Sequence, residues 1–143
     1  MKILILCRAN SCRSQMAEAI LKKIDPILFV KSAGPEPAEV VHPLTIKAME
    51  EIGIDISQSS TTNVNQFINE DWDFVITVCD IAKELCPLFS GKVKQSVHLR
   101  FEDPLEYEGS DEFLLELIRS TRNQIMNEFE DFYNEFLTSK LDT

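Results

Sequence analysis

Cys7 and Arg13 are the residues with which chemistry in this chain would begin, because a thiol and a guanidinium stand at the two ends of a short loop. Five residues separate them, enough for the loop to curl so that successive backbone amides point inward as an anion-binding nest. The planar fork of Arg13 then returns to the same centre and holds two oxygens of the anion. The predicted oxyanion-binding residues are Arg8, Ala9, Asn10, Ser11, Cys12 and Arg13.

The same loop is expected to act on the thiol of Cys7. A cysteine that faces a helix N-terminus beside guanidinium groups has its pKa lowered from about 8.5 to roughly 3.5–7.5. Cys7 is therefore predicted to be a thiolate, the attacking form, at neutral pH. Ser14 is placed to donate a hydrogen bond to that thiolate, and Asn10 tolerates the positive φ that a tight curl requires. The alternative is a buried thiol at a strand end, with Arg13 on a helix surface.

Four apolar runs in the sequence predict strands that position this loop. They lie at Lys2 to Leu6, Ile27 to Val30, Asp73 to Val78 and Val93 to Leu99. Helices are expected from the loop to Asp25, near Pro43 to Ile52 and, in a shorter piece, toward Asn69. Strands that alternate with helices indicate one α/β domain over residues 1–143, with a parallel sheet. Ligands bind at the carboxyl ends of such strands, which is where the loop after Leu6 lies.

The remainder of the chain is predicted to form one long amphipathic helix with Ser110 as its N-cap. Its apolar side chains recur at helical spacing, which is typical of core packing rather than of a cofactor site. These core positions are Leu114, Leu117, Ile118, Ile125, Phe129, Phe132 and Phe136.

Composition narrows the classes of function. The chain has 143 residues and a net charge of −10, which argues against nucleic-acid or anionic-membrane binding. No stretch approaches the roughly 20 apolar residues of a membrane helix, and the apolar run Ile3 to Leu6 is too short for a signal peptide, so we expect a cytoplasmic protein. In that compartment Cys7, Cys12, Cys79 and Cys86 stay reduced, with catalytic, redox and metal roles open. No metal is expected, because the cysteine spacings, with His42 and His98 distant, fit zinc templates poorly.

Asp103, directly before Pro104, lies in the loop after the fourth predicted strand, on the same edge of the sheet as Cys7. Displacing a hydroxyl or phenolic leaving group requires a proton, which a carboxylic acid near the nucleophile can supply. The alternative is an ordinary turn aspartate, which is common before proline. Glu102 is a weaker candidate for the same role.

The string Cys7-x-x-Asn10-x-Cys12-Arg13-Ser14 resembles the phosphate-binding loop of low-molecular-weight protein tyrosine phosphatases. Extended to Glu18, it is more similar to their relatives, the thioredoxin-coupled arsenate reductases. The resemblance continues through Ser32-Ala33-Gly34, Ile54-Asp55-Ile56-Ser57, Val78-Cys79 and Asp103-Pro104, and so covers nearly the whole chain.

This resemblance implies a four-stranded parallel sheet in the order 2-1-3-4, flanked by helices. It also implies that Cys7 is the nucleophile, that Arg13 stabilises the transition state and that Asp103 is the general acid. One departure is Ala9, where both branches usually carry glycine. If this position needs a positive φ, alanine costs on the order of 1 kcal/mol.

Cys79 and Cys86 separate the two branches. The resemblance implies that Cys7 forms an adduct with arsenate, that Cys79 attacks it and that Cys86 takes over the disulfide and presents it to thioredoxin. Seven residues of helix span about 10 Å, whereas a disulfide needs Cα atoms within roughly 7 Å. The segment Asp80 to Leu85 is therefore predicted to be mobile and to rearrange on oxidation. The alternative is that both cysteines are small buried hydrophobes.

Several alternatives remain at this point. A phosphatase acting on phosphotyrosine or small aryl phosphates needs only Cys7, Arg13 and Asp103, and a non-catalytic oxyanion sensor needs only the loop. Cys12 is interpreted as a packing residue, the alternative being a peroxide-inducible partner of Cys7. A potassium site of some arsenate reductases is matched by Asn10, Glu18 and Ser32, but Thr62 stands where an aspartate is expected, so no cation is predicted.

Overall fold

The computed structural model describes residues 1–138, and its centre is a four-stranded parallel sheet in the order β2-β1-β3-β4. The strands are β1 (Lys2–Leu6), β2 (Phe29–Ala33), β3 (Trp72–Thr77) and β4 (Val93–His98). The predicted α/β class and strand order are confirmed. Every residue from Ile3 to Leu6 is at most 1% exposed, because a central parallel strand is covered on both faces.

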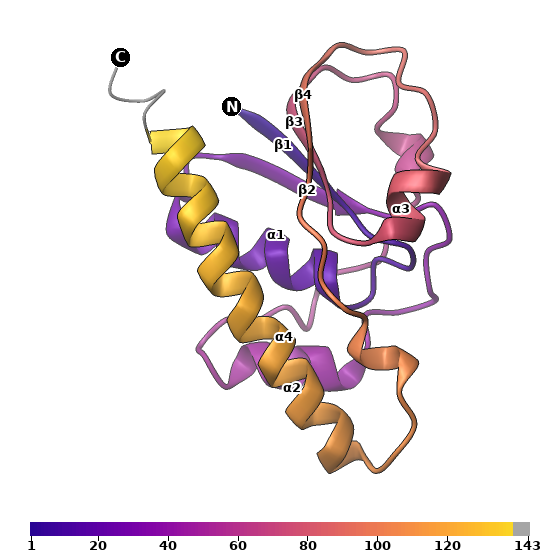
Figure 1. Ribbon diagram of the computed structural model, residues 1–143, viewed down its shortest axis with the longest axis vertical. Coiled ribbons are helices and arrows are strands. Elements are labelled where there is room, and N and C mark those ends of the chain that lie inside the picture. Colours follow the sequence, from indigo (N-terminus) through magenta and orange to yellow (C-terminus); the bar gives the residue numbers. More distant parts are fainter. Residues whose placement is uncertain (139–143) are drawn as a thin grey trace.

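Helices α1 (Arg13–Ile24), α2 (Pro43–Glu50) and α4 (Asp111–Phe132) group beside the strands, whereas α3 (Asp80–Leu85) lies apart from them next to β3 (Figure 1). Short 3-10 turns lie at η1 (Val64–Gln66) and η2 (Pro104–Glu106), and a π turn, η3 (Tyr133–Leu137), extends α4. None of the helices in residues 1–138 is long and apolar enough to cross a bilayer.

The second strand begins later than Ile27, so the predicted run Ile27 to Val30 is wrong in its bounds. Asp25 ends α1 and accepts the amide of Ile27 on its carboxylate at 3.1 Å and the amide of Leu28 on its carbonyl at 3.2 Å. This turn leaves Ile27 90% exposed, and pairing with β1 then carries β2 as far as Ala33. The strand was predicted from its hydrophobic residues, but the turn at Asp25 determines the residue at which pairing with β1 begins.

Helix ends follow local chemistry. Pro43 starts α2, and Gly53 at φ 79° closes the turn after it by donating its amide to the carbonyl of Glu50 at 2.9 Å. Ser110 caps α4 as predicted, its Oγ accepting the amide of Phe113 at 3.2 Å. Of the predicted core stripe on α4, Ile118, Ile125, Phe129 and Phe132 are buried, Leu114 and Leu117 are half-buried, and Phe136 is exposed. The part of this predicted helix beyond residue 138 lies outside the described residues.

Candidate active site

The loop from Cys7 to Arg13 lies at the carboxyl edge of the sheet, as predicted. The register places the last residues of all four strands in one row: Leu6 pairs with Ala33 and Thr77, and Thr77 pairs with His98. The residues that follow these strands therefore meet at one edge. They include Cys7 after β1, Cys79 shortly after β3 and the Phe101 to Asp103 loop after β4.

Gly34 lies in close contact with the backbone of the loop at Cys7 and Arg8. A Cβ at this position would lie 2.5 Å from the carbonyl oxygens of both Cys7 and Arg8, closer than any side chain tolerates. Its own amide donates to the carbonyl of Thr62 at 2.9 Å. Only glycine allows the two chain segments to approach this closely.

The carbonyl groups of the loop face outward, and its amides therefore face inward. Three carbonyls accept hydrogen bonds from the segment Glu36 to His42: Arg8 from Glu36 at 3.0 Å, Ala9 from Ala38 at 2.9 Å and Ser11 from His42 at 3.1 Å. In a trans peptide the next amide points away from its carbonyl, so the amides at positions 9, 10 and 12 point away from this segment. None of these amides donates a hydrogen bond to any group within residues 1–138. Ala9 and Cys12 line a cavity of about 420 Å³ together with Cys7, Arg13 and Asp103.

Asn10 holds the curl of the loop. Its φ of 52° is the only positive value of a non-glycine residue among the described residues, which confirms the prediction for this position. Ala9 therefore escapes the strain considered for it. The Oδ1 atom of Asn10 accepts the amide of Thr62 at 2.9 Å, so its Nδ2 group must face Ser14 at 2.7 Å and Ser32 at 3.0 Å.

Ser14 lies directly against the sulfur of Cys7, with 2.9 Å between Oγ and Sγ. Because Oγ already accepts a hydrogen bond from Asn10, its own proton is free to point toward the sulfur. The backbone amide of Ser14 also faces Cys7. Two donors thus converge on the thiol, as is required to stabilise a thiolate.

The predicted lowering of the Cys7 pKa is nevertheless wrong for this state of the protein. Cys7 is 2% exposed, and burial raises the pKa of its thiol above the ordinary value. The Ser14 hydroxyl, Arg13 and the Ser14 amide lower the pKa by less than burial raises it, and Cys79 adds a smaller upward effect. The sequence showed the donors but did not reveal how completely the sulfur is removed from water.

Arg13 is buried and reaches from α1 to the loop after β4, so the alternative of a surface arginine is wrong. Its Nη1 donates to the carbonyl of Phe101 at 3.0 Å, and its Nη2 lies 3.3 Å from Oδ2 of Asp103. The Asp103 side chain is 25% exposed, and its Oδ1 caps η2 by accepting the amide of Leu105 at 2.9 Å. Among the described residues Asp103, and not the exposed Glu102, is the carboxylate that pairs with Arg13.

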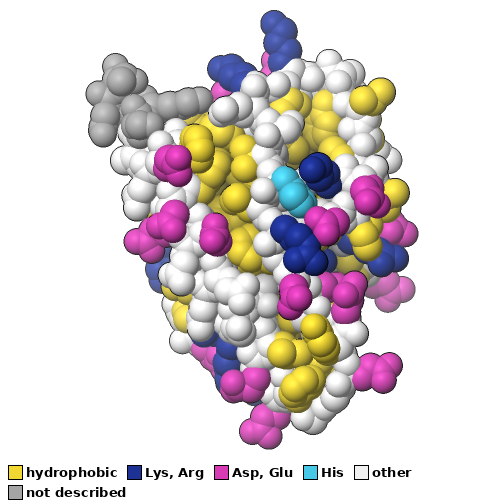
Figure 2. Space-filling view, viewed as in Figure 1, with side chains coloured by type: hydrophobic (Ala, Val, Ile, Leu, Met, Phe, Trp, Pro, Cys, Tyr) yellow, Lys and Arg dark blue, Asp and Glu magenta, His cyan; other side chains and the backbone are white. Residues whose placement is uncertain are grey.

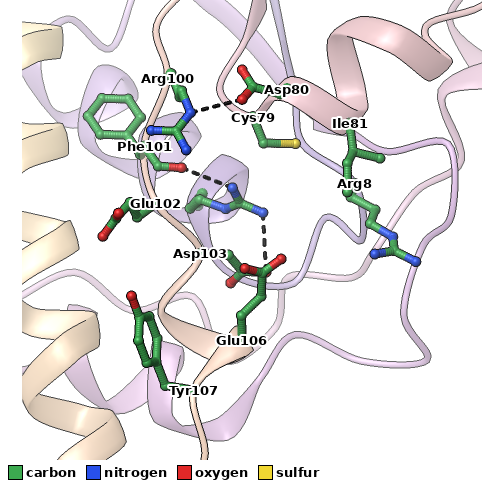
Figure 3. Close-up of a pocket in the computed structure, with 11 residues that line it drawn as sticks. Arg8, Cys79, Asp80, Ile81, Arg100, Phe101, Glu102, Asp103, Glu106 and Tyr107 are labelled. Atoms are coloured by element: carbon green, nitrogen blue, oxygen red, sulfur yellow. Dashed lines mark hydrogen bonds and ion pairs between the residues drawn. The ribbon is translucent and has the colours of Figure 1, made fainter.

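Two neighbouring cavities share Arg8, Arg13 and Asp103 as a common wall. Cys7 lines one of them, and Cys79 lines the other, which has a volume of about 180 Å³. Figure 3 shows Cys79 and Asp80 on one side of this second cavity and Asp103 and Glu106 on the other. Acidic and basic side chains are interspersed on the face of the molecule in Figure 2, so any attraction for an anion is local to the arginines and the loop amides.

Cys79 and Cys86 occupy the two ends of α3. Cys79 is 4% exposed, and its Sγ accepts the amide of Ala82 at 3.3 Å. Cys86 is half-buried, and burial raises the pKa of its thiol. All four cysteines are free thiols in this structure. The mobility predicted for Asp80 to Leu85 stays a prediction, since the segment forms a helix in this dithiol state.

Cys12 lies in the core beside Thr45, where burial raises the pKa of its thiol to about 12 despite the Thr45 hydroxyl. This position suits the predicted packing role. Sequence reasoning missed Gln15, whose Nε2 donates to both the carbonyl and Oδ1 of Asn10 and to the carbonyl of Ser60. The contact with Asn10 is local, whereas the one with Ser60 has no local signal because it joins segments 45 residues apart.

The residues matched to a potassium site are already engaged with each other or with neighbours. Asn10 Oδ1 accepts the Thr62 amide, Ser32 accepts from Asn10, and Glu18 pairs with Lys22 at 2.7 Å. Within residues 1–138, no three His, Cys, Asp or Glu side chains come together as metal ligands.

Comparison with known proteins places this geometry in context. Residues 2–140 match the family model described as low molecular weight phosphotyrosine protein phosphatase. An arsenate reductase of Halalkalibacterium halodurans is 41% identical over 91% of this chain and 93% of its own. A glutaredoxin arsenate reductase of Synechocystis is 37% identical over 91% and 94%. A solved arsenate reductase in the phosphate binding state superposes with a TM-score of 0.77 at 33% identity, over 94% of this chain and 97% of the other.

Proposed function

The chain belongs to the low-molecular-weight phosphotyrosine protein phosphatase family, and we propose that within this family it is an arsenate reductase driven by a three-cysteine relay. The observation that carries the proposal is the position of Cys79, which lines a cavity whose wall of Arg8, Arg13 and Asp103 also bounds the Cys7 loop. A phosphatase needs no thiol there. The names of the relatives support arsenate as the substrate.

In the first step the loop binds arsenate through its inward amides and Arg13. The thiolate of Cys7 attacks arsenic, a sulfur–arsenic bond forms, and one arsenate oxygen leaves as water. Arg13 donates to the bound anion and so gives up part of its contact with Asp103. Asp103, freed from Arg13, takes up a proton from solvent and delivers it to the departing oxygen, which leaves as water.

In the second step the thiolate of Cys79 attacks the sulfur of Cys7. A disulfide forms between the two cysteines, and the sulfur–arsenic bond breaks with its electron pair moving onto arsenic. Arsenate, As(V), thereby becomes arsenite, As(III), while two thiols are oxidised. The positions of the two thiols support this step, because Cys7 and Cys79 line neighbouring cavities that share Arg8, Arg13 and Asp103.

In the third step Cys86 attacks the sulfur of Cys79 and releases Cys7 as a thiolate. The disulfide Cys79–Cys86 now lies at the outer end of the relay, since Cys86 is the least buried cysteine. A dithiol protein of the cytoplasm, for which we propose thioredoxin, reduces it by two further exchanges. Because the Synechocystis relative is named a glutaredoxin arsenate reductase, the assay must compare both reductants.

Turnover assays of Cys79→Ser and Cys86→Ser test the function. Both variants are expected to lose sustained arsenate reduction with thioredoxin and to keep any hydrolysis of an aryl phosphate, which needs only Cys7, Arg13 and Asp103. Cys12→Ala is the matched control and is expected to keep arsenate reduction, because it removes a core thiol outside the relay and leaves the backbone amide of residue 12 in place.

If both serine variants keep full arsenate turnover, the relay is wrong and phosphatase becomes the better assignment. If wild-type enzyme turns over with glutathione and glutaredoxin but not with thioredoxin, the reductant is wrong and the relay through Cys86 must be replaced by a mixed disulfide with glutathione.

A further inference from the structure

A bridge of polar side chains fastens the first turn of α3 to the end of β4. The carboxylate of Asp80, the first residue of α3, contacts His98 Nε2 at 3.0 Å through Oδ1 and Arg100 Nε at 2.9 Å through Oδ2. His98 is itself fixed from β3, since its Nδ1 lies 2.7 Å from the hydroxyl of Thr77. We call the contacts of Asp80 with His98 and Arg100 the Asp80 bridge; Figure 3 shows its Arg100 half.

The apolar contacts of α3 with the core are few. A six-residue helix is too short to be stable by itself, so its contacts must supply the stability. Ala82 is the only fully buried residue within α3, Ile81 is half-buried, and Leu85 is 49% exposed. The Asp80 bridge therefore adds two polar contacts to the packing of Ala82 and Ile81 that attaches this helix to the sheet.

The first turn of α3 also covers the sulfur that the relay needs. Cys79 Sγ accepts the amide of Ala82, and the carbonyl of Cys79 accepts the amide of Lys83 at 3.3 Å. Cys86 stands at the other end of the helix, about 10 Å away along its axis, whereas bonded cysteines have Cα atoms within roughly 7 Å. Cys86 reaches the Cys79 sulfur only if this first turn opens, and Asp80 lies in that turn.

We propose that Asp80, through His98 and Arg100, is a positioning residue that holds α3 wound in the dithiol state and so opposes formation of the Cys79–Cys86 disulfide. This inference rests on the proposed relay. The bridge keeps Cys79 facing the cavity it shares with Arg13 until the first exchange has taken place. The contacts of Asp80 with His98 and Arg100 then break as Cys86 moves toward Cys79.

The test uses full-length protein carrying Cys7→Ser and Cys12→Ala, so that only two thiols remain. Glutathione disulfide oxidises them: Cys79–SH plus Cys86–SH plus one glutathione disulfide gives the protein disulfide and two glutathione molecules. The equilibrium constant in glutathione buffers is measured by mass spectrometry after acid quench. His98→Ala and Asp80→Asn are each added to this background.

His98→Ala is expected to raise the equilibrium constant for disulfide formation by about two- to fivefold, the scale of one exposed polar side-chain contact, and Asp80→Asn, which weakens both contacts, by at least as much. Lys94→Gln is the matched control. It removes an ion pair between β4 and β3, with Lys94 Nζ 3.1 Å from Asp73, and does not touch α3, so it is expected to leave the constant unchanged. A merely structural role would lower the thermal stability of all three variants without moving the thiol–disulfide equilibrium.

Equal constants in the background protein and in both bridge variants would overturn the proposal while leaving the relay intact. If the background protein forms no Cys79–Cys86 disulfide at all, the relay itself fails and the proposal fails with it.

Discussion

Arg13 Nη2 lies 3.3 Å from Asp103 Oδ2, so a carboxylate of the protein holds the guanidinium that we propose binds an incoming oxyanion. The chain thus supplies an internal competitor for its own anion site. Binding of the substrate and release of Asp103 become one event, because the fork of Arg13 cannot serve both partners fully. The same exchange frees Asp103 at the moment when a proton donor is needed.

Asp103→Asn separates these two effects. Removing the competing charge is expected to tighten phosphate binding several-fold, on the order of 1 kcal/mol for a partly exposed pair. Turnover of arsenate or aryl phosphate is expected to fall by about 100-fold, because general acid catalysis is lost. Calorimetry with phosphate and steady-state assays measure both effects. Weaker phosphate binding in this variant would contradict competition between Asp103 and the anion, and Glu102→Gln is the control that should change neither.

Ser14→Ala removes the hydroxyl 2.9 Å from the Cys7 sulfur. A hydrogen bond to a charged group contributes about 1.5–3 kcal/mol, so alkylation of Cys7 by iodoacetamide at pH 8 is expected to slow by roughly 10- to 100-fold. The rate is followed by peptide mass spectrometry. Ser32→Ala is the control, because Ser32 accepts from the same Asn10 amide without touching Cys7. Unchanged alkylation in the Ser14 variant would show that the hydroxyl does not stabilise the thiolate.

Gly34→Ala is expected to disable the loop more than it destabilises the protein. Its Cβ would meet the carbonyl oxygens of Cys7 and Arg8 at 2.5 Å, which forces the loop to shift and misdirects its amides. Gly53→Ala provides the comparison, since its φ of 79° costs alanine about 1–2 kcal/mol far from the site. Thermal unfolding and phosphate binding are measured for both. Only the Gly34 variant should lose phosphate binding at a temperature where it remains folded.

Glu51 makes stability depend on acid pH. Its pKa falls from 4.5 to about 2, mainly because Arg119 pairs with the carboxylate. Burial raises the pKa by a smaller amount, and Arg122 lowers it further. Because the folded-state pKa is the lower one, the stabilisation is complete above about pH 4.5 and is lost as the pH falls toward 2. Glu51→Gln is expected to flatten the thermal midpoint across this range relative to wild type, whereas Glu50→Gln is not. Parallel curves for wild type and Glu51→Gln would refute the assignment.

Local sequence patterns predicted most features within a single helix, strand or loop. They predicted far fewer of the contacts between segments that are distant in the chain. The bounds of β1, the Ser110 cap and the positive φ of Asn10 follow from neighbouring residues and were predicted correctly. The start of β2 was missed because the Asp25 turn, rather than hydrophobicity, sets it. The contact of Gly34 with the loop links segments that only the fold brings together.

The pKa of Cys7 shows the same limit for chemistry. The groups that lower this pKa lie within seven residues of the sulfur, so the Ser14 hydrogen bond and the Arg13 charge could be predicted from the sequence. The size of the opposing effect depends on how completely the surrounding core removes the sulfur from water, and in this structure burial is the largest influence on the pKa of Cys7. The residues next to Cys7 in the sequence do not indicate how deeply the folded protein buries its sulfur.

The most direct test of the account is to trap the first disulfide. Cys86→Ser protein, freed of external thiols, is mixed with excess arsenate, and arsenite and disulfides are measured by chromatography and peptide mass spectrometry. We predict one arsenite per chain and a disulfide between Cys7 and Cys79. No arsenite, or a disulfide from Cys7 to Cys12 in its place, would contradict it.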